Sequence, residues 1–237
     1  MGLVGLIPAA GQAKRLPQLP CSKEIFPIGI GERIVNDQIE KFPRPIISYL
    51  LEQLTRAGVN KSIVITHKDK PDILRFLGDG SSYGMDLIYQ VQEKLLGMPY
   101  AMDLAYPWIK NDIVLFGMPD TIFTPPDVFE RILDRLITSN FDVTLGLFPT
   151  QKPQKFGMVD FDSTSYDFIY TVDKPITTTL RYMWGVACWQ PRFTEFMHNY
   201  LMAHRFESEL VFSTVLQAAH DDGIQVNVFP FENGEFI

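Results

Sequence analysis

GLVGLIPAA (residues 2–10) opens the chain as an unbroken apolar run, and GQAKRL (residues 11–16) follows it directly. An apolar run of this length that gives way to polar residues predicts a β-strand buried on both faces. The segment 11–33 is polar and punctuated by glycine and proline, which predicts a long loop after that strand. This junction between a buried strand and a polar loop is the starting point for the fold.

Strands and helices are expected to alternate through the first half of the chain. Further buried strands are predicted at 62–66, 86–91 and 112–117, and helices at 46–57, 72–77 and 98–109. This alternation predicts an α/β fold with a Rossmann-like, mostly parallel (mixed) sheet and helices on both faces. Ligands of such sheets bind at the carboxyl ends of the strands, so we expect a site in the loops after Ala10, Val91 and Gly117.

The second half of the chain is richer in strands. Strands are predicted at 142–148, 156–161, 168–173, 184–189 and 225–231, and helices at 127–137, 191–203 and 209–221. No repeat, low-complexity tract or long linker separates the two halves. The sequence therefore predicts a single domain over residues 1–237, with a first half of 1–125 and a β-rich second half of 126–237.

Composition excludes several classes of protein. The net charge of −7, from 21 basic and 28 acidic side chains, argues against a protein that binds a nucleic acid polymer. Two cysteines, Cys21 and Cys188, cannot build a disulfide framework or a zinc site, which favours a reducing cytoplasmic compartment. There is no basic leader before the first apolar run and no stretch of 18 apolar residues, so neither a secretion signal nor a membrane partner is expected.

The loop after the first strand carries the first candidate residues. Small residues around Gly11 let backbone amides approach a phosphate closely, and Lys14 and Arg15 add positive charge. Lys23 lies in the same loop, and two cations on one loop can neutralise a triphosphate. The alternatives are a plain turn with a solvated basic pair, and a Lys23 that pairs with Glu24 or with nothing.

Two further segments place charged residues after strands. Asp120, in FGMPDTIF (116–123), stands where a Mg²⁺ ligand belongs in an α/β fold, because carboxylate and phosphate oxygens suit that ion. The alternative is a turn or helix N-cap aspartate, although Asp127 is better placed to cap the next helix. Asp173 and Lys174 supply the acceptor and the cation that a sugar phosphate needs, but the pair alone is uninformative.

Taken in order, these segments resemble the sugar-phosphate nucleotidyltransferase family, in particular glucose-1-phosphate thymidylyltransferases and uridylyltransferases. The segments that carry the resemblance are LIPAAGQAKRL (6–16), SKEIFPI (22–28), RPIISYLLEQLTRAGV (44–59), FLGDGSSYGMDLIYQVQ (76–92), LFGMPDTIF (115–123), KFGMVDFD (155–162), VDKP (172–175) and WGVACW (184–189). The resemblance covers nearly the whole chain. It rests on all these segments in this order and not on any single one of them.

The resemblance implies a fold of the nucleotide-diphospho-sugar transferase type, with a nucleotide-binding half (1–125) and a sugar-binding half (126–237). It implies that a nucleoside triphosphate, dTTP or UTP, reacts with a sugar 1-phosphate such as glucose 1-phosphate, with Mg²⁺ as cofactor. Family members often associate, so a homo-oligomer is compatible with it. The implied residues are Arg15, Lys23 and Asp120 for catalysis, Asp120 for the metal, Ala9, Ala10, Gly11, Gln92 and Gly97 for the nucleotide, and Gly157, Asp173, Lys174 and Gly185 for the sugar phosphate.

Three departures from the family pattern leave an alternative open. The loop usually reads GxGTRL, whereas Ala13 and Lys14 stand here, and the charged segment 29–42 resembles a surface insertion. A late D-x-G element supplies a second metal-binding aspartate in the family, and the sequence stops at Ile237, about where it should follow; Glu232 and Glu235 are candidate substitutes. A non-catalytic relative that binds nucleotide or nucleotide-sugar is therefore the second interpretation. A third, an oxidoreductase, is disfavoured because GxGxxG is absent.

Overall fold

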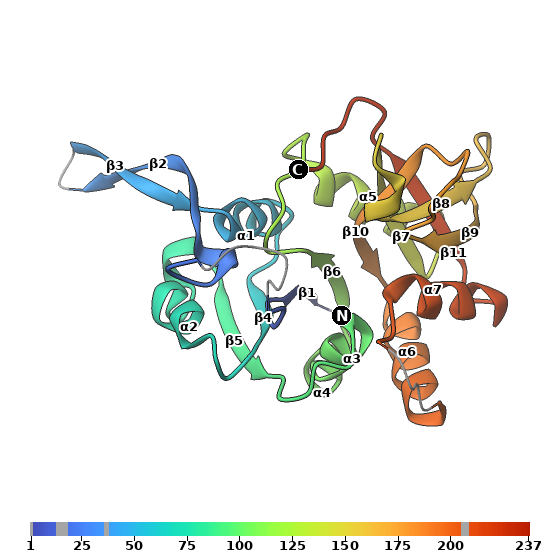
Figure 1. Ribbon diagram of the computed structural model, residues 1–237, viewed down its shortest axis with the longest axis horizontal. Helices are drawn as coiled ribbons and strands as arrows, with labels where there is room; N and C mark the ends of the chain where they lie inside the picture. Colours follow the sequence, from blue (N-terminus) through green and yellow to red (C-terminus); the bar gives the residue numbers. More distant parts are fainter. Residues whose placement is uncertain (1, 13–18, 36–37, 205–208) are drawn as a thin grey trace.

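The computed structural model describes residues 2–12, 19–35, 38–204 and 209–237 (Figure 1). The strands are β1 (Leu3–Pro8), β2 (Pro27–Val35), β3 (Gln38–Pro45), β4 (Lys61–Thr66), β5 (Asp86–Val91), β6 (Ile113–Gly117), β7 (Val143–Pro149), β8 (Gly157–Phe161), β9 (Phe168–Asp173), β10 (Tyr182–Trp189) and β11 (Val226–Pro230). The helices are α1 (Ile47–Arg56), α2 (Pro71–Leu77), α3 (Met98–Asp103), α4 (Tyr106–Ile109), α5 (Val128–Ser139), α6 (Pro191–Ala203) and α7 (Phe212–Asp221).

One mixed sheet runs through both halves of the described chain. Its main order is β11-β7-β10-β6-β1-β4-β5, and β8 and β9 extend it beside β10. The pairs β6–β1, β1–β4 and β4–β5 are parallel, whereas β10 runs antiparallel to both β6 and β7. The chain moves outward from β1 through β4 to β5 and then returns to β6 on the other side of β1. The strand order therefore reverses between β1 and β6, which is where such sheets bind ligands.

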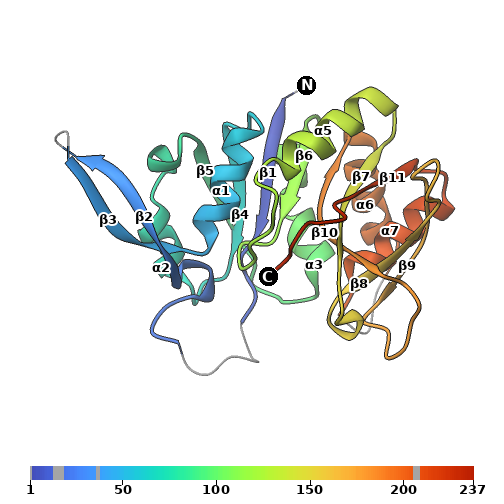
Figure 2. The ribbon, with the colours of Figure 1, turned by 90° about the horizontal axis from the view of Figure 1, so that it is seen from above.

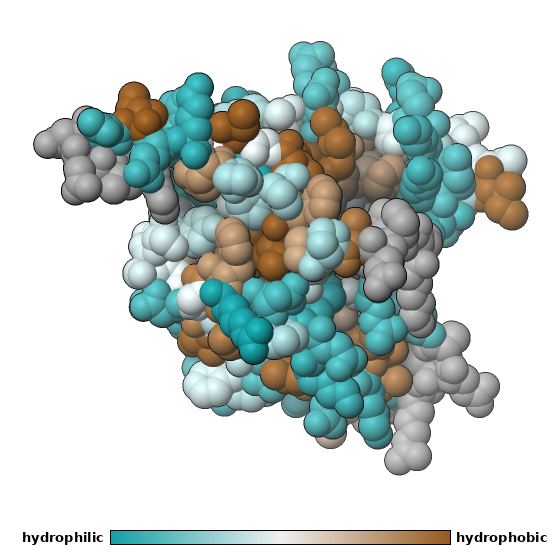
Figure 3. All heavy atoms as spheres, turned by 60° about the vertical axis from the view of Figure 1, so that its left-hand side comes forward, coloured by the Kyte–Doolittle hydropathy of each residue, from teal (hydrophilic) through white to brown (hydrophobic). Residues whose placement is uncertain are grey.

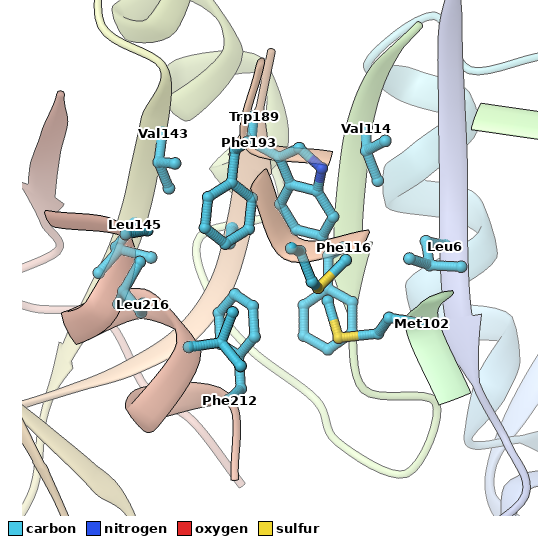
Figure 4. Packing of buried hydrophobic residues seen from close by; sticks show 14 of the residues in the cluster. Leu6, Met102, Val114, Phe116, Val143, Leu145, Trp189, Phe193, Phe212 and Leu216 are labelled. Carbon is cyan, nitrogen blue, oxygen red and sulfur yellow. The ribbon is translucent and has the colours of Figure 1, made fainter. Parts of the chain in front are cut away.

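Helices cover both faces of the sheet, as the alternating pattern predicts. Side chains of α1, α2 and α5 pack on one face, and side chains of α3, α4, α6 and α7 pack on the other (Figures 1 and 2). Figure 4 shows the core on the face covered by α3, α4, α6 and α7. There the Phe116 ring of β6 packs against the rings of Trp189 and Phe212, at centroid distances of 5.9 and 5.8 Å. The two cores hold the carboxyl ends of β1 and β6 side by side.

The long loop predicted at 11–33 is wrong in its second part, because residues from Pro27 onward form β2. This strand pairs with β3 in a hairpin that stands away from the main sheet (Figures 1 and 2). Gly31 lowers the strand propensity of this segment, so the sequence pattern did not predict β2. The missing side chain of Gly31 leaves the space that the Phe42 ring of β3 fills. Ile30 and Ile39 are 72% and 68% exposed. Figure 3 brings this side of the molecule forward, where hydrophobic and hydrophilic residues alternate over the surface. The described residues of the segment 29–42 thus form a surface excursion, as expected.

Two helix predictions need correction. The helix expected over 98–109 is divided into α3 and α4, because Pro107 lacks the amide that a continuous helix would use. The helix expected over 209–221 begins only at Phe212, because Leu210 forms a β-bridge with Gly97 and Val211 is extended. No helix in the described part of the chain is long and apolar enough to cross a membrane.

Candidate active site

A cavity of about 780 Å³ opens at the carboxyl ends of the central strands. It is lined by residues that follow β1, β5 and β6, together with residues of α3 and of the second half. The lining residues are Pro8, Ala10, Gly11, Gln12, Lys23, Gln92, Leu95, Gly97, Met98, Ala101, Met118, Asp120, Lys155 and Glu209. The cavity thus lies at the reversal of strand order and collects six of the residues that the sequence analysis assigns to the site.

The loop after β1 begins in a rigid setting. Ala9 is fully buried, and its amide donates to the Ile65 carbonyl of β4 at 2.7 Å. Ala10 and Gly11 then line the cavity, where the absence of large side chains leaves the backbone accessible to a ligand. Arg15, the predicted catalytic arginine, lies outside the described residues.

Lys23 and Asp120 meet inside the cavity although 97 positions separate them. The Lys23 Nζ lies 2.5 Å from Asp120 Oδ2, and the two side chains are 22% and 25% exposed. The same Nζ lies 3.9 Å from the point where a Cβ on Gly11 would stand. The alternative partner for Lys23 is wrong, because Glu24 is turned into the protein and pairs with Lys70. A cation and a carboxylate therefore face the glycine loop together.

Asp120 belongs to a turn that begins directly after β6. The Thr121 hydroxyl closes this turn by donating to the Met118 carbonyl at 3.0 Å. Asp127 stands at the N-cap position of α5, but its carboxylate makes no capping hydrogen bond and instead accepts from Arg131 at 2.9 Å. The Asp120 carboxylate is thus directed to the cavity rather than to the helix.

Gln92 and Gly97 form the side of the cavity that faces α3. Gln92 follows β5 and is 5% exposed. Its backbone N–H donates to the Thr66 carbonyl at 2.8 Å. Gly97 has a φ of +110°, and a Cβ there would stand 2.2 Å from the Leu210 carbonyl oxygen. Glycine is required because the segment before α7 crosses directly over this position.

The four residues predicted for the sugar phosphate lie on or directly after the neighbouring strands β8, β9 and β10. Asp173 pairs in register with Gly157 across β8 and β9, and its carboxylate lies 3.2 Å from Lys174 Nζ. The space beside Gly157 is filled by the Trp184 indole. Gly185 follows Trp184 on β10, and the space beside Gly185 is taken by the rings of Phe148 and Phe236.

Lys155 and Glu209 line the cavity but have no predicted role. Lys155 precedes Phe156, whose carbonyl accepts a hydrogen bond from the Lys174 amide at 2.9 Å, so it connects the cavity with the Asp173–Lys174 pair. Its place in the KFG segment is the only sequence signal for it. Glu209 has no such signal, because the sequence places it in a helix.

The donor set fits Mg²⁺ held partly by a substrate. Among the described residues no three His, Cys, Asp or Glu side chains come together as a metal cage. Mg²⁺ is commonly bound by one or two carboxylates together with phosphate oxygens and water, so the partly exposed Asp120 carboxylate suits it. Glu232 lines a separate hollow beside Arg181, and the Glu235 backbone pairs with Thr124, so neither appears among the described cavity residues.

The fold and the cavity together define a doubly wound α/β protein, with a glycine loop, a lysine and an aspartate at the switch point of the sheet. The family model described as nucleotidyl transferase matches residues 4–233. The chain belongs to this family of sugar-phosphate nucleotidyltransferases, as its resemblance predicts.

Individual relatives agree with this assignment. A glucose-1-phosphate thymidylyltransferase of Neisseria meningitidis is 29% identical over 161 residues, which are 67% of this chain and 51% of the relative. The low-salt glycan biosynthesis nucleotidyltransferase Agl11 of Haloferax volcanii is 25% identical over 187 residues, which are 78% of this chain and 51% of the relative. The chain spans about half the length of these curated relatives.

Solved structures share the fold. A Bacillus anthracis structure described as a glucose-1-phosphate thymidylyltransferase in complex with sucrose gives a TM-score of 0.83 at 20% identity, covering 99% of this chain and 89% of the other. UDP-glucose pyrophosphorylase complexed with UDP-glucose gives 0.78 at 17% identity, covering 100% and 92%. The fold is therefore that of the nucleotide-diphospho-sugar transferases.

Proposed function

We propose that this chain condenses a nucleoside triphosphate, dTTP or UTP, with a sugar 1-phosphate to give a nucleotide-sugar and pyrophosphate. Glucose 1-phosphate is the first sugar to test, because several relatives are named for it. The observation that carries the proposal is the meeting of Lys23, Asp120 and the glycine loop in one cavity.

The reaction is an in-line displacement at the α-phosphorus. A phosphate oxygen of the sugar 1-phosphate forms a new bond to this atom, and the bond to the bridging oxygen of the β-phosphate breaks. Pyrophosphate leaves with that electron pair. Because the nucleophile is already an anion, no strong general base is needed, and positioning with charge neutralisation supplies the catalysis.

Lys23, Arg15 and Lys174 are the proposed cations for this task. The Lys23 ammonium forms an ion pair with Asp120, and a bound triphosphate would offer the same ammonium further anionic oxygens. Asp120 would hold Mg²⁺, and the ion would supply positive charge to the phosphate oxygens when bound.

Gln92 and Gly97 are proposed to receive the base, together with the backbone of residues 9–11. Asp173 and Lys174 are proposed to bind the sugar phosphate, and Gly157 contributes its backbone opposite Asp173. Gly185 is proposed to line the sugar pocket with its backbone, since the rings of Phe148 and Phe236 fill the space where a side chain would stand. The proposal includes a cytoplasmic location, supported by the free thiols of Cys21 and Cys188, and leaves a homo-oligomer open.

Pyrophosphate release tests the proposal. We would supply Mg²⁺ and each of dTTP, UTP, CTP, ATP and GTP with glucose 1-phosphate and other sugar 1-phosphates. Asp120→Asn and Lys23→Met should each lower kcat/KM by at least about 100-fold, the size of effect that a lost transition-state charge contact produces. Asp86→Asn is the matched control, since this exposed aspartate begins β5 at the end away from the cavity.

Release with one substrate pair, lost in both site variants and kept in the control, would establish the enzyme and its substrates. Nucleotide binding without release under any pairing would refute catalysis by this chain. That outcome would favour the second candidate, a nucleotide-binding regulatory relative.

A further inference from the structure

Lys23 stands between two residues that are both fastened to the start of α2. The Ser22 amide and hydroxyl donate to Asp72 Oδ2 and Oδ1 at 2.7 and 2.8 Å. Lys70 Nζ donates to both carboxylate oxygens of Glu24 at 2.8 and 2.9 Å. The backbone is therefore held on each side of Lys23, and the Lys23 side chain is left to reach the cavity.

The anchoring contacts are directional, and they are buried at Glu24 and Lys70 and partly buried at Ser22 and Asp72. Glu24 is 1% exposed and Lys70 is 9% exposed, and Lys70 Nζ also donates to the Ala9 carbonyl at 2.9 Å. Burial raises the pKa of the Glu24 carboxyl, and the hydrogen bond and charge of Lys70 oppose that rise. Burial alone would raise the pKa of Asp72, but hydrogen bonds from Ser22 outweigh it and leave that pKa lowered.

Through Lys70 the two loops of the phosphate site are joined. Ala9 directly precedes Ala10 and Gly11, which line the cavity, and Glu24 directly follows Lys23. A buried ion pair is costly to desolvate, and an apolar pair would fill the same space without that cost. What the ion pair adds is a fixed geometry between the glycine loop and the segment that carries Lys23.

Such fixing matters because a lysine ammonium sits on a flexible four-carbon stem. Its position relative to a phosphate is defined only when the backbone beneath it is held. Displacement of a positioned group by about 1 Å can cost about 100-fold in rate. Lys70 and Asp72 are not among the described residues that line the cavity, so they act only through the residues they hold.

We infer that Lys70 and Asp72 are positioning residues that hold Lys23, and through Ala9 the glycine loop, in register with the bound triphosphate. The inference deepens the function proposed above and rests on it for its kinetic readout. A second readout, which needs no turnover, is the chemical accessibility of Lys23 itself.

The test compares Asp72→Ala with Asp69→Ala, a control that removes a mostly exposed carboxylate three residues away. Asp72→Ala should lower kcat by about 10-fold and change KM for the sugar 1-phosphate by less than about 2-fold, because the displaced Lys23 is proposed to contact the triphosphate and not the sugar phosphate. Asp72→Asn keeps one acceptor oxygen for Ser22 and should restore part of kcat. If Asp72→Ala does not fold, Ser22→Ala, which removes only the hydroxyl bond, provides the comparison.

For the second readout, pyridoxal 5′-phosphate labels Lys23, borohydride fixes the adduct, and peptide mass spectrometry quantifies it. Pyrophosphate should protect Lys23 from labelling in the wild type. Asp72→Ala should need about 10-fold more pyrophosphate for equal protection, a loss of about 1.4 kcal/mol in binding free energy. Equal protection in Asp72→Ala and Asp69→Ala, with equal kcat, would overturn the inference. A wild type that never releases pyrophosphate, yet shows this difference in protection, would refute the proposed function and support the inference.

Discussion

Gly97→Ala tests how the cavity is closed between the two halves of the chain. Gly97 has φ +110° and ψ 168°, a backbone region open in practice only to glycine. A Cβ there would stand 2.2 Å from the Leu210 carbonyl oxygen, and that oxygen belongs to backbone. The substitution must therefore push Leu210 and its neighbour Glu209 away from α3.

The expected cost has two parts. Backbone strain at such a position contributes about 1–3 kcal/mol. Displacing packed backbone contributes about 1–3 kcal/mol more, so Gly97→Ala should lower the free energy of unfolding by about 2–6 kcal/mol. Gly84→Ala is the matched control, because Gly84 is also left-handed, at φ 70° and ψ 25°, and a Cβ there would meet only Thr55 Cγ2 at 3.7 Å. Its cost should stay at about 1–2 kcal/mol.

Urea unfolding of both variants and the wild type, analysed with a common slope, measures the two costs. Nucleotide titration in the presence of Mg²⁺, under conditions where all three proteins are folded, should show weaker binding for Gly97→Ala only. A Gly97→Ala variant that is no less stable than Gly84→Ala would refute the argument that Leu210 crosses directly over Gly97.

Three further predictions follow from other contacts. Asp72→Asn should lower the urea midpoint at neutral pH, and this difference should shrink as the pH falls through the lowered pKa of the Asp72 carboxyl, because the wild-type carboxylate then becomes protonated too; a difference that stays unchanged down to about pH 2 would contradict this. In the folded protein an alkylating reagent should label Cys21 slowly and Cys188 hardly at all, because burial raises the pKa of both thiols. The same Asp72→Asn change should speed Cys21 labelling, since the Asp72 charge also raises that pKa, and peptide mapping that finds no change in rate would speak against it. Phe236→Ala should lower the free energy of unfolding by about 2–3 kcal/mol, because its ring packs against Phe123 and Phe148. The loss should be smaller than for a fully buried phenylalanine, since Phe236 is only partly buried. A loss under about 1 kcal/mol in urea unfolding would refute that role.

Local patterns predicted the elements that depend on short-range burial. The runs 62–66 and 86–91 became β4 and β5 almost without change. β4 is buried along nearly its whole length, as its apolar run predicts, whereas β5 is an edge strand and only partly buried. The order of strands and helices then predicted a parallel sheet and a site at its carboxyl edge. The hairpin of β2 and β3 escaped prediction, because Gly31 packs against Phe42 of the partner strand, and that contact has no local signature.

The sequence by itself also identified Lys23 and Asp120 as residues suited to phosphate and metal chemistry, since their types and their places after strands are local facts. Only the tertiary structure decided that they meet, because 97 positions separate them and their contact depends on how β1 and β6 pair in the sheet. It likewise decided that Glu24 turns inward to Lys70 instead of to its neighbour, and that Glu209 reaches the cavity. Ion pairs and cavity walls between distant segments are set by packing and strand register, which leave no periodic trace along the chain.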